Sequence, residues 1–422
     1  MRKIVINGQK ELTGEIKISG AKNSVVALIP AAILSDDKVT LYNVPDISDT
    51  RSLIDIINLL KCESEYSDET LVIDTKNIQN TLIPESLSKK LRASYYFMGA
   101  LLAKFHYAEI YFPGGCNIGS RPIDFHIKGF EKLGAKVEIE GNKYIFRAEK
   151  LKGARIYLDF ASVGATINIM LAACKAEGTT YISNAAKEPE IVNIATLLNN
   201  MGARISGAGT SEIRIEGVEH LHSAVIDVIP DRIEAGTYTI IGALCGKDLK
   251  ITGIIEDHID ALLSKLKEMG VEYKCTINTL TISAPKEYKP VNIRTLVFPG
   301  FPTDLGQPMC ALLTQTNGVS ILEETIYENR IGHIKYLQKM GAHVRQENRT
   351  SIIIGPSKLK GTEVEATDLR AGACMVTAGL IAEGTTTIDN IEHILRGYEN
   401  IVEKLTNVGA DIKIIDDEID KK

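Results

Sequence analysis

The chain has 422 residues, 44% of them hydrophobic and 24% charged, which is typical of a globular protein with two or three domains. Its net charge of −6 argues against nonspecific nucleic-acid binding, so an anionic ligand would need a local cluster of cations. The seven cysteines and eight histidines form no disulfide or metal-binding pattern, and we expect reduced thiols, no metal and no cofactor. No signal peptide and no apolar run of ~18 residues is evident, which predicts a cytoplasmic protein without a membrane segment.

Along the chain, an amphipathic helix that stops at a glycine and is followed by a strand recurs. The five glycines are 68, 68, 71 and 68 residues apart: Gly134, Gly202, Gly270, Gly341 and Gly409. A degenerate sixth copy has Lys61 at this position, 73 residues before Gly134. Glycine is expected there because many helices end on a left-handed residue, which glycine adopts without strain.

A second kind of helix recurs with the same period and is apolar on nearly every side, which predicts that it is buried. Its copies are expected at 25–34, 95–103, 167–173, 238–244, 309–313 and 375–381. Each copy starts at a polar group: residues 22–23, 92–94, 162–164, 231–234, 303–304 and 368–370. The chain is therefore predicted to be an α/β protein of six repeated units, each with two helices and several short strands.

Polar and charged residues gather at the starts of both kinds of helix. If three units close into a ring around their buried helices, all helix N-termini of one ring point the same way, and two facing rings would direct twelve helix ends at one cleft. Ordinary capping explains about half of these residues, since Asp and Ser are favoured caps. It explains the arginines poorly, because a cation opposes the dipole of a helix N-terminus unless an anion lies between them.

Cys116 stands on a glycine-rich loop, residues 114–124, between a strand predicted at 108–112 and a helix predicted at 123–133. Free cysteines are usually buried, but three glycines and Arg121 close by favour a part-exposed thiol beside a cation. The loop therefore predicts a reactive cysteine next to an anion site.

Several motifs together resemble those of the UDP-N-acetylglucosamine 1-carboxyvinyltransferases. They are GAKN at 20–23, PGGCNIGSRPID at 113–124, SVGAT at 162–166, FPTD at 301–304, ENR at 328–330 and DLRAG at 368–372. The resemblance covers residues 1–416. It implies transfer of the enolpyruvyl group of phosphoenolpyruvate to the 3-hydroxyl of UDP-N-acetylglucosamine, with release of phosphate, in the first committed step of peptidoglycan synthesis.

The resemblance also implies the fold and the domains. The family has two inside-out α/β barrels, each of three βαβαββ-type units, and its chain crosses between the barrels twice. One domain is accordingly expected at residues 21–229, with the Cys116 loop and much of the nucleotide site. The other is expected at residues 1–20 and 230–422.

By motif position, Cys116 corresponds to the proton donor, which can form an adduct with phosphoenolpyruvate, and Asp304 to the base near the 3-hydroxyl. Lys22 and Arg396 complete the implied catalytic set. The cations expected to neutralise phosphoenolpyruvate and phosphate are Lys22, Arg92, Arg121, Arg330, Arg370 and Arg396. The expected nucleotide and sugar contacts are Asn23, Arg121, Pro122, Ile123, Asp124, Phe125, Ser162, Val163, Gly164, Ile326 and Asp368.

The chain departs from common family members at Tyr96, Asn117 and residues 160–161, and none of these changes removes a charged catalytic group. Two alternatives remain. A 3-phosphoshikimate 1-carboxyvinyltransferase shares the fold and the leaving phosphate but lacks the cysteine loop. A catalytically silent paralogue would bind UDP-N-acetylglucosamine and regulate wall synthesis. The sequence does not predict the oligomeric state.

Overall fold

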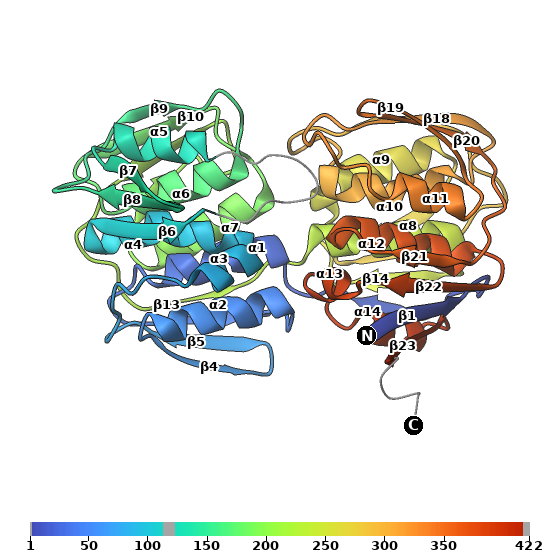
Figure 1. The fold of residues 1–422 in the computed structure, drawn as a ribbon, viewed down its shortest axis with the longest axis horizontal. Coiled ribbons are helices and arrows are strands. Elements are labelled where there is room, and N and C mark those ends of the chain that lie inside the picture. The colour runs from blue at the N-terminus through green and yellow to red at the C-terminus, as the bar shows by residue number, and fades with distance from the viewer. Residues whose placement is uncertain (1, 113–122, 417–422) are drawn as a thin grey trace. The chain divides into compact units, whose positions relative to one another are not determined.

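The computed structural model describes residues 2–112 and 123–416, which form two compact units (Figure 1). The first unit comprises residues 20–112 and 123–229, and the second comprises residues 2–19 and 230–416. The chain passes from one unit to the other after Ser19 and again after Ile229. In the described part of the chain, no helix has the length and apolarity needed to span a membrane.

The described part of the first unit contains three helices that are buried almost all round and three amphipathic helices with an exposed face, besides shorter elements. Its helices are α1 (Lys22–Ala32), α2 (Ser48–Leu59), α3 (Glu85–Lys90), the 3-10 helix η1 (Arg92–Tyr95), α4 (Tyr96–Phe105), α5 (Asp124–Lys132), α6 (Val163–Ala173) and α7 (Pro189–Asn200). Its strands are β3 (Lys38–Tyr42), β4 (Glu63–Ser67), β5 (Thr70–Asp74), β6 (Tyr107–Tyr111), β7 (Lys136–Glu140), β8 (Lys143–Arg147), β9 (Arg155–Tyr157), β10 (Thr179–Ser183), β11 (Arg204–Ser206), β12 (Glu212–Glu216) and β13 (Ala224–Asp227).

The second unit has the same plan. Its helices are α8 (Arg232–Cys245), the 3-10 helix η2 (Glu256–His258), α9 (Asp260–Glu268), α10 (Thr303–Leu313), α11 (Ile334–Lys339), α12 (Leu369–Ile381), α13 (Glu392–Leu395) and α14 (Ile401–Asn407). Its strands are β1 (Arg2–Asn7), β2 (Glu15–Lys17), β14 (Leu249–Thr252), β15 (Tyr273–Thr276), β16 (Thr279–Ile282), β17 (Asn292–Arg294), β18 (Gly318–Glu323), β19 (His343–Glu347), β20 (Thr350–Gly355), β21 (Glu363–Glu365), β22 (Thr385–Asp389) and β23 (Asp411–Asp416).

The core of each unit is built on its three apolar helices. In the second unit α8, α10 and α12 all pack against one another, and in the first α4 packs against both α1 and α6. In Figure 1 the helices of each unit lie between its sheets. Because these helices have no polar face, their side chains can leave water only by meeting each other and the inner faces of the sheets.

Six sheets enclose these helices, three in each unit, in the part of the chain that the structure describes. Five sheets have four strands, with one parallel pair and two antiparallel pairs, as in the order β11-β12-β10-β9. Along β10 only alternate residues are fully buried, and Ile182 pairs with Ile156 on one side and Ile213 on the other. The predicted α/β class and the six repeated units are confirmed.

One repeat departs from the predicted βαβαββ order. The sheet β6-β8-β7 has three strands, and α3 with η1 precedes α4 where the other repeats have a short parallel strand before their buried helix. The last amphipathic helix also differs, because it is divided into α13 and α14 around Asn400, which has a left-handed φ of 50°.

The helix ends behave alike in all six repeats. Each of the five repeat glycines has a positive φ, between 85° for Gly270 and 108° for Gly409. In each, the following residue donates its N–H to a carbonyl one turn back, as Ala203 does to Leu198. In the sixth copy Lys61 has a φ of 66°, and Cys62 N–H bonds to the Ile57 carbonyl in the same way. Lys61 therefore adopts a conformation that suits glycine.

We predict that Lys61→Gly stabilises the protein by about 1 kcal/mol, because it removes the strain of a side chain in the left-handed region. Lys132→Gly is the matched control, since Lys132 is an exposed residue in the last turn of α5. It should destabilise by about 1 kcal/mol, as glycine does in right-handed helix. Urea unfolding midpoints measure both, and equal destabilisation by the two changes would contradict the prediction.

Candidate active site

Asp304 of the second unit lies in the first turn of α10, between two buried arginines. Its Oδ1 is 2.8 Å from Arg330 Nη1 and its Oδ2 is 3.1 Å from Arg370 Nη2. The arginine side chains are 5% and 4% exposed, whereas that of Asp304 is 24% exposed. The carboxylate is thus partly exposed to solvent and is ion-paired with two buried arginines. The structure brings these three predicted site residues together.

Arg330 is held by groups around Asp304. Its Nη1 donates to Thr303 Oγ1 at 2.9 Å, and the Thr303 hydroxyl donates to Glu324 Oε2 at 2.8 Å. Glu324 is buried, and its Oε1 accepts the backbone N–H groups of Ile326 and Tyr327 at 2.8 and 3.0 Å. The predicted contact residue Ile326 is therefore fixed by its backbone.

Arg370 is held at the start of α12. Asp368 caps this helix, and its Oδ1 accepts the N–H groups of Arg370 and Ala371, each at 2.9 Å. The guanidinium group of Arg370 lies 5.4 Å from the ring centre of Tyr398. The predicted site residue Arg396, two positions before Tyr398 in the chain, is half-buried. Burial alone would lower the pKa of Arg370, but Tyr398 and Asp304 beside it raise the pKa overall. Arg370 is a permanent cation, and the predicted ligand Asp368 serves as a helix cap.

In the first unit, Lys22 is the first residue of α1 and its Nζ lies 3.1 Å from Asp49 Oδ2. Asp49 lies in the first turn of α2, and both side chains are largely buried, at 14% and 6% exposure. A lysine at a helix N-terminus opposes the helix dipole, and Asp49 compensates for it. Asn23, the next residue of α1, is half-buried.

The starts of α4, α5 and α6 come together elsewhere in the first unit. Ser162 caps α6 by accepting the Ala165 N–H at 3.2 Å. A Cβ on Gly164 would lie 3.0 Å from both His126 Cε1 and Tyr95 Oη, so a larger residue there would require these side chains to shift by a few tenths of an ångström. Arg92 of η1 lies 6.0 Å from the Tyr95 ring centre. Three predicted groups, Arg92, residues 123–125 and residues 162–164, thus lie close to His126.

The other predicted residues of these segments differ in exposure. Ile123 is buried just before α5, Asp124 is exposed, and Phe125 is half-buried with Lys128 Nζ 5.9 Å from its ring centre. Val163 is half-buried at the start of α6. Cys116, Arg121 and Pro122 lie outside the described residues.

The described cysteines, unlike what is predicted for Cys116, are not poised to react. They are free thiols, and burial raises the pKa of Cys62 and Cys275 to about 11. Burial raises the pKa of Cys174, Cys245 and Cys310 to about 12. Within the described ranges, no three His, Cys, Asp or Glu side chains form a group that could hold a metal.

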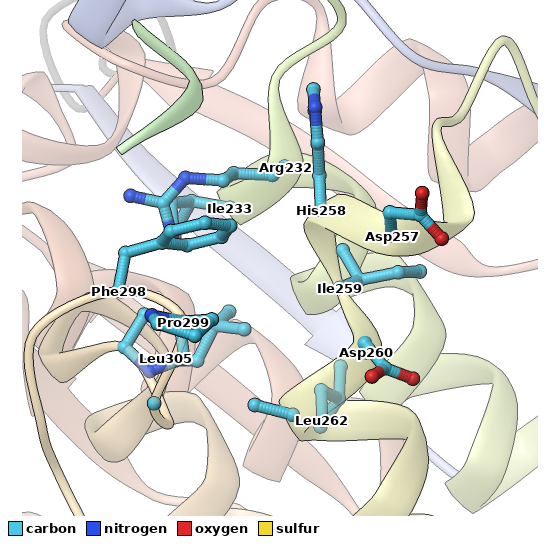
Figure 2. A pocket seen from close by; sticks show the side chains of 13 residues that line it. Arg232, Ile233, Asp257, His258, Ile259, Asp260, Leu262, Phe298, Pro299 and Leu305 are labelled. Carbon is cyan, nitrogen blue, oxygen red and sulfur yellow. The ribbon is translucent and has the colours of Figure 1, made fainter. Parts of the chain in front are cut away.

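A small pocket lies beside the loop that leads into α10 (Figure 2). Arg232, the first residue of α8, covers the ring of Phe298 at 5.5 Å from its centre. The loop closes on itself where Leu296 N–H bonds to the Phe301 carbonyl at 2.9 Å. None of the predicted site residues lines this pocket.

Sequence reasoning missed several partners that position the predicted residues: Asp49, His126, Gln307, Glu324, His333 and Tyr398. Asp49, His126 and Gln307 lie inside helices, and the other three lie in connections between elements. The signal that could have found His126, Gln307 and His333 is a polar residue at a repeat position that is apolar in other repeats.

Comparisons with known proteins show the family to which the chain belongs. The family model described as EPSP synthase (3-phosphoshikimate 1-carboxyvinyltransferase) matches residues 6–405. The chain is 53% identical over 410 residues to UDP-N-acetylglucosamine 1-carboxyvinyltransferase 2 of Listeria monocytogenes, covering 97% of each chain. It is 52% identical over 425 residues to the Bacillus subtilis enzyme of the same name, covering 100% and 99%.

Solved structures show the same fold. The enolpyruvyl transferase NikO from Streptomyces tendae superposes with a TM-score of 0.89 at 27% identity, covering 98% of both chains. EPSP synthase from Acinetobacter baumannii superposes with a TM-score of 0.77 at 18% identity, covering 99% of this chain and 100% of that one.

We predict that Thr303→Val destabilises the second unit by about 1 to 3 kcal/mol, because it leaves Oε2 of the buried Glu324 without its hydroxyl donor and removes one of the two acceptors of Arg330 Nη1. Thr303→Ser is the control, since it keeps the hydroxyl and should stay within about 0.5 kcal/mol of the parent chain. Thermal and urea unfolding measure the effect. Equal stability of the two variants would show that this hydroxyl does not hold the cluster.

Proposed function

We propose that this chain, which belongs to the UDP-N-acetylglucosamine 1-carboxyvinyltransferase family, transfers the enolpyruvyl group of phosphoenolpyruvate to the 3-hydroxyl of UDP-N-acetylglucosamine and releases phosphate. This is the first committed step of peptidoglycan synthesis. The observation that carries the proposal is the identity of 52% along the whole chain with an enzyme of that name. The ion-paired Asp304 supports it, because a carboxylate at the solvent edge of a cationic cluster suits a reaction between an anion and a hydroxyl.

The addition step needs one proton delivered and one removed, and the elimination step removes a second proton. The methylene carbon of phosphoenolpyruvate gains a proton as the sugar oxygen bonds to its neighbour, and the hydroxyl proton must leave. The resulting methyl group then gives up a proton as phosphate departs, which restores the double bond. We assign the delivery of the first proton to Cys116 and the acceptance of the hydroxyl proton to Asp304.

The ion pairs limit how Asp304 can act. Arg330 and Arg370 stabilise its negative charge, and a carboxylate so stabilised is a weak base toward a neutral alcohol. We therefore propose that Asp304 first orients the hydroxyl by accepting its hydrogen bond. It takes the proton only as the new C–O bond makes that proton acidic.

The cations and contact residues have assigned roles under the same proposal. We assign Lys22, Arg92, Arg121, Arg330, Arg370 and Arg396 to the phosphate and carboxylate of phosphoenolpyruvate and to the leaving phosphate. The sugar nucleotide would meet Asn23, residues 121–125, residues 162–164 and Ile326. We further propose that the first and second units are the two barrel domains predicted at 21–229 and at 1–20 with 230–422.

One assay separates this function from the alternatives. Phosphate release is followed with phosphoenolpyruvate and either UDP-N-acetylglucosamine or shikimate 3-phosphate. We expect turnover with the sugar nucleotide alone. Turnover with shikimate 3-phosphate would support the second candidate function, which the description of the family model names. Binding of the sugar nucleotide without turnover would identify a silent paralogue.

Asp304→Asn should lower turnover at least ~100-fold, because the amide keeps the shape and cannot accept the proton. Binding of UDP-N-acetylglucosamine, measured by calorimetry, should be largely retained. Asp55→Asn on the exposed face of α2 is the control and should leave turnover unchanged. Near-normal turnover of Asp304→Asn would place the base elsewhere.

Fosfomycin, an epoxide phosphonate that occupies the phosphoenolpyruvate position in this family, should inactivate the protein with time and leave one covalent mark, on Cys116. The described thiols should stay unmodified, because a pKa of about 11 to 12 leaves almost no thiolate near pH 7. Cys116→Asp should resist the drug yet stay active, since a carboxylic acid can supply a proton. Intact-mass spectra test this, and an adduct that persists after Cys116→Asp would contradict it.

A further inference from the structure

Two buried histidines occupy a repeat position that is otherwise apolar. The position lies eight residues before the glycine, or Lys61, that ends each amphipathic helix. Its six occupants are Leu53, His126, Ile194, Leu262, His333 and Ile401. The four aliphatic side chains are fully buried, and the histidines are 5% and 3% exposed. One histidine falls in each unit.

A second repeat position shows the same exception. It lies 34 residues before the same glycine or Lys61, inside the buried helix, and its occupants are Ala27, Ala100, Asn168, Gly236, Gln307 and Met375. Only Asn168 and Gln307 are polar there, and both are buried. Asn168 Nδ2 bonds to His126 Nδ1 at 2.9 Å, and Gln307 Nε2 bonds to His333 Nδ1 at 3.2 Å. The two polar exceptions therefore pair with each other in both units.

Each of these histidines is neutral. An amide N–H that donates to Nδ1 leaves the ring proton on Nε2. Burial, with a smaller contribution from a nearby arginine, lowers the pKa of His126 to about 3. The pKa of His333 is lowered to about 4, mainly by burial. The charge of Asp368 raises this pKa, and the charge of Arg330 lowers it. A buried polar pair rarely stabilises a core more than apolar side chains of the same shape, which calls for a reason other than stability.

The pair in the second unit is built into the Asp304 cluster. Gln307 lies three residues after Asp304 on α10, and its Nε2 also donates to Asp368 Oδ2 at 3.3 Å. Asp368 caps α12 through the backbone N–H of Arg370, and His333 follows Arg330 by three residues. Gln307 thereby joins the starts of α10, α11 and α12, the three helices next to which Asp304, Arg330 and Arg370 stand.

Three buried polar atoms of this group have no hydrogen-bond partner among the described residues: Gln307 Oε1, Arg330 Nε and His333 Nε2. The group is thus not built for stability alone. In the first unit, by contrast, the Asn168 side chain also holds the backbone. Its Nδ2 donates to the Tyr95 carbonyl at 3.2 Å, and its Oδ1 accepts the Gly99 N–H at 2.9 Å.

We propose that Gln307 and His333 are positioning residues for the enolpyruvyl transfer, an uncharged link that keeps Arg330 and Arg370 in the geometry where both pair with Asp304. This inference rests on the proposed function. The link has to be uncharged, because another cation would compete for Asp304 or Asp368 and another anion would compete for the arginines. An aliphatic pair, as in other repeats, would fill the space but would leave the arginines less constrained.

The test places the residues of other repeats at these positions. His333→Leu and Gln307→Met should each lower kcat about tenfold or more, with KM for UDP-N-acetylglucosamine within about twofold, because geometry around Asp304 matters most in the transition state. Thermal midpoints should stay equal or rise. The double variant should be no worse than either single one, since the two residues act as a unit.

Two further variants sharpen the result. His333→Asn keeps an acceptor for the Gln307 N–H and should recover most of the lost kcat. Leu262→Ile changes the same repeat position in another repeat of the second unit and should keep the parent kcat. The parent protein is assayed first, and absence of its turnover would overturn the proposed function and this inference with it.

If the parent protein turns over, two outcomes overturn the inference alone. In the first, His333→Leu and Gln307→Met both keep kcat within twofold. In the second, their activity falls together with the thermal midpoint and His333→Asn restores neither, which would make the pair structural.

Discussion

Burial of helices that have no polar face is the constraint on which the rest of this structure depends. Such a helix can leave water only when other helices and sheets surround it, so three repeats must come together before any of them is stable. Once buried, these helices have their charged side chains at their ends. The side chains of the second unit that we propose to act in the reaction accordingly stand at helix starts, with Asp304 at α10 and Arg370 at α12. Fold and site therefore follow from one requirement.

The sequence could predict the features that depend on local chemistry. Glycine at the end of five of the six amphipathic helices and Ser162, Asp231 or Asp368 as a cap follow from backbone geometry, and the structure has them. The sequence did not predict that the second repeat departs from the common order, with α3 and η1 in the place of the first strand. The partners of the charged residues could not be predicted either. Asp49 and Glu324 become partners only through contacts between separate elements. The loop with Cys116 remains a prediction from motif alone.

The two units solve the same electrostatic problem in different ways. A cation in the first turn of a helix is unfavourable, and a buried one costs several kcal/mol unless it is paired. In the first unit Asp49, from a neighbouring helix start, pairs with Lys22. In the second unit Asp304 pairs with Arg370, while Asp368 satisfies the backbone N–H groups of the same helix. Each unit therefore holds its cations ready without any ligand.

This pairing affects what binding an anion would involve. An anionic ligand that reaches Lys22 or Arg370 meets a cation already desolvated and already paired, so it exchanges one carboxylate partner for another rather than removing a hydrated cation from water. The net gain is smaller than for a bare cation, but the side chains lose little further freedom, and specificity comes from shape and position. A site of this kind trades affinity for preorganisation, which favours a transition state whose charge develops where the arginines already point.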